Sequence, residues 1–312
     1  MKINGLLTGA LGLLLYSACT AEHPEEERTG LLQLKEVAVG GETRALVTTD
    51  GLAAVSLYVT REGVPYTLGG NTPLVQFTKS GNAWSTSSPF SIYGGKPAKV
   101  YACYPVVNAV SSSGSNVFTV PVTVISEDDF SAGSQTDYLY GSSEATADNP
   151  SVTLAMQHAL AKVSFCVKKA TGTAETIKLT KLEMLSAGNN LWRGTGVMNL
   201  SDGSLDGLTS SASVLLTSAS GITLEGGTTA ANLFSLVAPM KKAEQQLSFR
   251  LTVDIDNDSY TFLTGSVKGD VQWKAGRHYL YTITVNKVGG TLTGIQINGW
   301  MDDASQDTHI GI

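Results

Sequence analysis

Apolar residues that recur at every second position are the feature that most constrains this chain. Leu247–Ile255 places an apolar side chain at each alternate position, and Ala161–Val167 does the same. A period of two belongs to a strand with one buried face, whereas the apolar stripe of a helix repeats every 3.6 residues. Long stretches with helical spacing are almost absent from the 312 residues. The sequence therefore predicts an all-β fold.

Turn-forming residues divide these alternating segments. For example, Asp256–Ser259 is typical of a hairpin turn. The chain is 42% hydrophobic, which is enough to give each of two domains its own core. We therefore expect two β-sandwich domains in tandem. Small polar and turn residues accumulate in Gly141–Pro150, which places the boundary there and gives domains of residues 31–150 and 151–312. Leu154–Leu160 fits either a strand or one helical turn.

The N-terminus has the features of an export signal. Residues 1–19 carry one lysine, an apolar run at Leu6–Tyr16, and small residues before Cys19. The run is shorter than the roughly 20 residues that span a membrane, but it suits a signal peptide. We expect a lipoprotein signal in which Cys19 becomes the lipid-modified N-terminus. An ordinary secretory signal, cut at Ala18 or Ala21, is the alternative.

Residues 20–30 form an acidic tether that cannot bury enough apolar area to become ordered. A short strand follows it, and its two apolar clusters lie in different phases of the alternation. Leu32 and Leu34 are at even positions, whereas Val37 and Val39 are at odd positions. A β-bulge near Lys35–Glu36 would reconcile the two clusters. A strand that fits loosely against its sheet would also accommodate the change of phase.

The composition excludes several classes of function. With 15% charged residues and a net charge of -6, the chain has no basic field for nucleic acid. No catalytic or nucleotide-binding motif is present, so we expect no enzyme activity and no cofactor. His158 is interpreted as a hydrogen-bonded packing residue at a sheet margin rather than a catalytic base. His278 is expected at the surface.

No metal site is predicted either. The three cysteines form no zinc-binding pair, and Cys103 and Cys166 lie within expected strands, where buried free thiols are commoner than a disulfide. Asp254–Asp258 imitates the start of a calcium loop. However, Ser259 and Gly265 occupy the positions that need Gly and Glu, so a hairpin turn explains this run better.

An ordered set of segments covers nearly the whole chain and resembles the fimbrillin family, the type V pilins and related fimbrial lipoproteins of Bacteroides and Porphyromonas-like bacteria. After Trp84, the segments are KVYACYP, DYLYGSSE, VTLAMQHALAKVSFCV, FSLVAPMKKAEQQLSFRLTV and KAGRHYLYTITVNKVGGTLTGIQINGW. The resemblance implies two transthyretin-like β-sandwich domains and a lipoprotein precursor at the cell outer membrane. It also implies an arginine-specific protease that removes the first strand, and polymerisation with other fimbrial subunits by donor-strand exchange.

Applied to this sequence, the resemblance points to cleavage between Arg44 and Ala45, which would remove the strand at residues 31–44. The flanking residues 40–43 leave the backbone accessible to a protease. Loss of a strand exposes unpaired backbone groups and an apolar groove, which the strand of another subunit would fill. The donor segment would be Thr291–Trp300 or the tail to Ile312. The alternative is an arginine in an exposed loop that follows an uncut strand.

The sequence thus favours a structural subunit of an extracellular fimbria, in adhesion or biofilm formation, with a host or bacterial surface ligand. The tail has few apolar residues, Ile310 and Ile312, and is therefore a poor groove filler, which suggests a tip or accessory subunit. The acidic run Glu25–Glu27 also resembles an export signal to the cell exterior, although a solvated spacer would have the same composition. A monomeric surface lipoprotein that binds glycans is the alternative function. An exported hydrolase that uses the Glu127–Asp129 cluster is a remote third.

Overall fold

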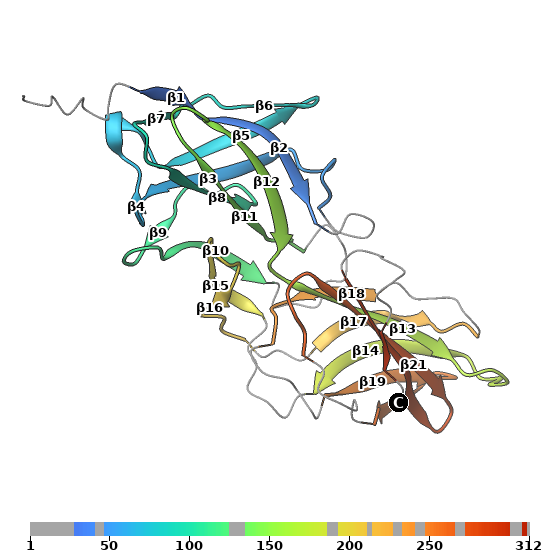
Figure 1. The fold of residues 1–312 in the computed structure, drawn as a ribbon. Coiled ribbons are helices and arrows are strands. Elements are labelled where there is room, and N and C mark those ends of the chain that lie inside the picture. The colour runs from blue at the N-terminus through green and yellow to red at the C-terminus, as the bar shows by residue number, and fades with distance from the viewer. Residues whose placement is uncertain are drawn as a thin grey trace, which may run out of the picture.

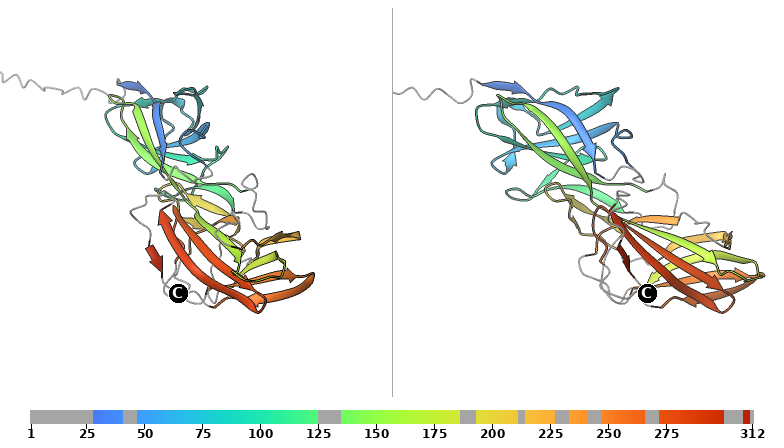
Figure 2. Two further views of the ribbon diagram at one scale, coloured as in Figure 1. Left: turned by 90° about the vertical axis from the view of Figure 1, so that its right-hand side faces the viewer. Right: turned by 45° about the vertical axis from the view of Figure 1, so that its right-hand side comes forward.

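The computed structural model describes residues 28–40, 47–124, 135–185, 193–210, 214–226, 233–240, 247–265, 272–299 and 308–310. Strands dominate these residues, and the helical element among them is a 3-10 turn at Leu68–Gly70. No helix in this part of the chain is long and apolar enough to cross a membrane. The predicted all-β class is confirmed. Figures 1 and 2 show two lobes, with the N-terminal strands at one end and the C-terminal strands at the other.

The first lobe is built on one large sheet. Its strand order is β2 (Gln33–Val39), β12 (Ser151–His158), β11 (Leu139–Ala145), β8 (Ala98–Tyr104), β3 (Ala54–Arg61), β5 (Leu74–Ser80) and β6 (Ala83–Ser85), with β4 (Val64–Pro65) paired to β3. The two end strands, β2 and β6, lie against each other, so the sheet curls over its apolar face. A two-stranded sheet of β1 (Thr29–Leu31) and β7 (Ser91–Tyr93) closes the lobe at one end.

The second lobe is a β-sandwich. One sheet has the order β18 (Leu233–Val237), β13 (Ala161–Lys169), β21 (Arg277–Asn286), β22 (Gly289–Gly299) and β23 (Thr308–Ile310). The other has the order β17 (Val214–Thr223), β14 (Ile177–Leu185), β19 (Ser248–Ile255) and β20 (Asp258–Leu263). The ring of Phe249 in β19 packs 5.1 Å from that of Phe165 and 4.8 Å from that of Tyr281. These contacts join the two facing sheets, as expected for the core of a β-sandwich.

A small sheet between the lobes contains strands from both halves of the chain. Its order is β16 (Leu205–Asp206), β15 (Gly194–Asn199), β10 (Phe118–Val124) and β9 (Ser111–Ser112). Phe118 packs on the rings of Tyr58 and Tyr101 in the first lobe, at 5.1 and 5.5 Å. The same apolar cluster continues into the second lobe, so the core crosses from one lobe to the other.

The chain passes between the lobes later than the sequence predicts. The turn-rich segment Gly141–Pro150 contains most of β11 and the connection to β12, and β12 pairs with β11 and β2 in the first sheet. Leu154–His158 is therefore strand rather than a helical turn. We propose a domain boundary at Ala159–Leu160, between β12 and β13, in place of Pro150. The sequence hides it because both strands are apolar and only two residues separate them.

One histidine prediction is wrong. His278 is buried rather than exposed, and its Nε2 lies 2.8 Å from the Ser164 hydroxyl. The reason is its position on β21, which lies between β13 and β22 in the middle of a sheet. In contrast, His158 is a buried packing residue as predicted, with Nδ1 2.9 Å from the Asp137 carboxylate.

Two further predictions are confirmed. Cys103 and Cys166 are free thiols, and Cys103 is buried. The hairpin between β19 and β20 turns at Asp256 and Asn257, whose φ values of 50° and 78° are those of a type I′ turn. No group of three or more metal-ligating side chains occurs among the residues described above.

Candidate functional site

The N-terminal segment, residues 28–40, lies at the edge of the first lobe. It contains β1 and β2, and β2 is the end strand of the large sheet, next to β12 (Figure 1). As an end strand, β2 has one neighbour in that sheet, so its removal breaks one ladder there. We call the surface that it covers, formed by β12, β7 and the residues behind them, the strand groove.

β2 runs parallel to β12 and places its apolar side chains in the groove. Leu34 lies opposite Val152, and Val37 lies opposite Leu154. Between these pairs the register shifts by one residue, because Lys35 has no partner on β12. This is the β-bulge expected from the two apolar clusters. It turns Leu34 and Val37 to the same face although they are three residues apart.

Burial is the main attachment of this segment. Leu32, Leu34, Val37 and Val39 are each 3–4% exposed, whereas Leu31 is 50% exposed. At about 1.5–3 kcal/mol for each buried side chain, the four contribute a gross stabilisation on the order of 6–12 kcal/mol before ordering entropy. Without the segment, the apolar core behind it would meet water.

β1 pairs with β7 on the other side of the groove. The Gly94 N–H donates to the Arg28 carbonyl at 2.8 Å, and the Leu32 N–H donates to the Phe90 carbonyl at 2.9 Å. In an antiparallel ladder, residues at alternate positions turn their backbone groups to opposite sides. Phe90 and Gly94 therefore face β1, whereas Ser91 and Tyr93 direct their backbone groups away from it.

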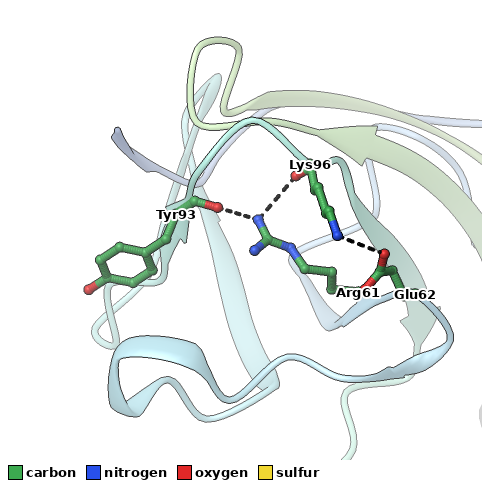
Figure 3. A network of polar contacts seen from close by, with 4 residues as sticks. All are labelled: Arg61, Glu62, Tyr93 and Lys96. Atoms are coloured by element: carbon green, nitrogen blue, oxygen red, sulfur yellow. Dashed lines mark hydrogen bonds and ion pairs between the residues drawn. The ribbon is translucent and has the colours of Figure 1, made fainter. Parts of the chain in front are cut away.

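Side chains satisfy the backbone groups on that far side of β7. Asn71 bonds to Ser91, and the hydroxyl of Tyr66 accepts a 2.8 Å hydrogen bond from the Tyr93 N–H. The Arg61 guanidinium donates to the Tyr93 carbonyl and, at 3.1 Å, to the Lys96 carbonyl. Figure 3 shows the contacts of Arg61 with Tyr93 and Lys96. β7 is thus held in place by contacts that do not involve β1.

β1 passes very close to the connection between β11 and β12. A Cβ atom at Gly30 would lie 2.2 Å from the Ala147 carbonyl oxygen, so a larger residue does not fit without a backbone shift. Beside it, Arg28 forms an exposed 3.0 Å ion pair with Asp148, which contributes little in water. Glycine is required here by the close approach of two backbones.

The predicted site residues Cys19, Arg44 and Ala45 lie outside the described residues, as does the Glu127–Asp129 cluster. In sequence, Arg44 follows the end of β2 by five residues. The sequence predicted the strand and left a bulge or a loose fit as the two explanations of its phase change, but it gave no sign of the roles of Asn71 and Tyr66. Asn71 carried no signal beyond that of a turn-forming residue.

Comparison with known proteins is consistent with this architecture. A family model described as fimbrillin-like matches residues 43–300. A fimbrial protein from Bacteroides vulgatus superposes with a TM-score of 0.59 at 15% identity, covering 87% of this chain and 99% of that one. A candidate cell adhesion protein from Bacteroides uniformis superposes with a TM-score of 0.54 at 16% identity, covering 88% and 100%. No curated protein matches the sequence.

Proposed function

Because this chain belongs to the fimbrillin-like family, we propose that it is a fimbrial subunit that is matured by cleavage after Arg44 and polymerises by donor-strand exchange. The family and the fold support the coarser role, a fimbrial subunit at the cell surface. The proposal adds export as a lipoprotein, anchored in the outer membrane through Cys19, and an arginine-specific protease as the processing partner.

The observation that carries this proposal is the strand groove together with the position of Arg44. A single cut after Arg44 separates the whole N-terminal segment from the rest of the chain. Its departure would expose the core side of β12 and the unpaired backbone groups of two strands. A strand from another subunit restores both the pairing and the burial by β-augmentation.

Of the two C-terminal candidates for the donor, the tail that includes β23 is the easier one to release. β23 pairs only with Ile295–Ile297 and lies at the edge of its sheet, whereas β22 is paired with β21 along its whole length. Releasing the tail therefore breaks far fewer backbone hydrogen bonds than releasing β22. The cost of release therefore favours the tail over Thr291–Trp300, whereas the tail's few apolar residues, Ile310 and Ile312, suit an apolar groove poorly.

The test is an Arg44→Ala variant expressed in a fimbriated host, with Arg28→Ala as the matched control in the same N-terminal segment. We expect Arg44→Ala to accumulate as an unpolymerised precursor, and Arg28→Ala to polymerise. The readouts are subunit ladders on gels and the N-terminal sequence of surface-extracted protein. Ladders of normal length from Arg44→Ala would contradict the proposal. An unprocessed N-terminus in wild-type surface protein would favour the monomeric glycan-binding lipoprotein instead.

A further inference from the structure

The bulge at Lys35 weakens the hold of the resident strand on the groove. We propose that it keeps the N-terminal segment replaceable, and that the preferred occupant of the groove is a strand of another subunit whose apolar residues alternate without interruption. The inference rests on the proposed strand exchange and adds the sequence pattern that the groove selects.

The wall of the groove is regular. Along β12, Val152, Leu154 and Met156 are buried, and the residues between them, Thr153 and Ala155, are exposed. A strand with the same period of two pairs with this wall at every step without a shift of register. The bulge therefore belongs to the resident strand and not to the groove.

The extra residue brings no compensating contact. Lys35 is exposed, and none of the side-chain hydrogen bonds or ion pairs found among the described residues involves it. A bulged residue interrupts the backbone ladder of its strand. Without Lys35, the sequence reads Leu-Gln-Leu-Glu-Val-Ala-Val, in strict alternation, and Leu34, Val37 and Val39 keep their present partners on β12. The bulge is thus a removable defect.

The parallel direction of the β2–β12 pairing also weakens the hold of the resident strand. β2 runs parallel to β12, and a parallel ladder is slightly less stable per residue than an antiparallel one. The resident strand is therefore held by a parallel ladder that is also interrupted. Besides the pairing of β1 with β7, its attachment depends on the burial of four apolar side chains, which a foreign strand can supply equally well.

The competing explanation is protection of an edge. β2 is an end strand, and bulges on end strands also discourage aggregation. This explanation predicts that removing Lys35 changes self-association and leaves strand replacement unaffected. The two explanations therefore differ in a measurable quantity.

The experiment uses the full chain with a site-specific protease site placed in residues 41–46, so that a cut leaves the N-terminal segment bound without a covalent link. Three fluorescent peptides then compete for the groove: the native sequence of residues 28–40, the same peptide without Lys35, and the Lys35→Ala peptide, which keeps the bulge. Fluorescence anisotropy reports binding. We expect the Lys35-deleted peptide to bind about tenfold more tightly, the effect of about one restored hydrogen bond. The Lys35→Ala peptide should match the native one within about twofold.

Equal affinity of the native and Lys35-deleted peptides would overturn the inference. Aggregation of the full chain lacking Lys35, with unchanged peptide exchange, would assign the bulge to edge protection and overturn it as well. If no peptide bound in the groove, the result would contradict the proposed strand exchange. The inference, which rests on that exchange, would then be overturned too.

Discussion

Asn71 binds both backbone groups of Ser91, donating from Nδ2 to the Ser91 carbonyl at 2.6 Å and accepting from the Ser91 N–H at Oδ1 at 3.2 Å. One side-chain amide thus takes the place of a neighbouring strand for this residue of β7. Because β7 is a wall of the strand groove, this contact holds the wall by bonds that do not involve β1.

Replacing Asn71 should destabilise the first lobe. Asn71→Ala leaves a backbone donor and acceptor of Ser91 without their partner, at a cost of about 1–3 kcal/mol. Urea denaturation measures this loss. Asn108→Ala, at an exposed position with no side-chain hydrogen bond among the described contacts, is the control and should have little effect. Equal effects of the two variants would show that Asn71 does not hold β7.

A charge on the buried side of the N-terminal segment should detach it. Val37→Asp buries a carboxylate among apolar neighbours and should cost more than about 2 kcal/mol. Leu31→Asp makes the same kind of change at a half-exposed position and should be tolerated. Limited proteolysis of the segment compares the two. Similar cleavage rates would contradict the burial argument.

Gly30 should tolerate no side chain. Gly30→Ala forces the Ala147 carbonyl to move, and we expect a loss of about 1–3 kcal/mol in thermal or chemical unfolding. Gly95→Ala is the matched control, because no atom lies within 4 Å of the position that its Cβ would occupy. A stable Gly30→Ala protein would mean that β1 and Ala147 separate readily.

The two thiols should differ in reactivity. Burial raises the pKa of Cys103 to about 12, so at neutral pH this thiol is protonated as well as inaccessible. Cys166 is only partly buried. An alkylating reagent should therefore modify Cys166 first and reach Cys103 only on unfolding. Mass spectrometry after timed quenching gives the order. Equal rates, or a disulfide between them, would contradict it.

Alkaline pH should destabilise the fold. Burial raises the pKa of Cys103 to about 12 and raises the pKa of Tyr138, Tyr279 and Tyr281 above their ordinary value. The unfolded chain therefore loses these protons first. The stabilisation is complete below about pH 8.5, the ordinary thiol pKa, and is lost as the pH rises towards 12. Denaturation midpoints from about pH 8 to 11 measure it, and Cys103→Ala should flatten the slope. A constant midpoint would contradict the prediction.

The sequence predicts local structure well where one alternating face is buried. The strand at Leu247–Ile255 follows directly from the spacing of apolar residues. The change of phase in the N-terminal strand was also visible, and the structure shows that a bulge rather than a loose fit accommodates it. Pairing between distant strands leaves no comparable trace, so neither the parallel contact of β2 with β12 nor the burial of His278 was predictable. The N-terminal strand was expected from its apolar residues, but Asn71 acts on a residue twenty positions away.

The small sheet between the lobes determines how the molecule would respond to a pull. β10 and β15 belong to different halves of the chain and are paired from Thr119–Asn199 to Val124–Gly194. Tension that draws the lobes apart therefore acts on a backbone ladder as well as on the covalent connection between β12 and β13. A subunit of this design would resist extension as one mechanical unit.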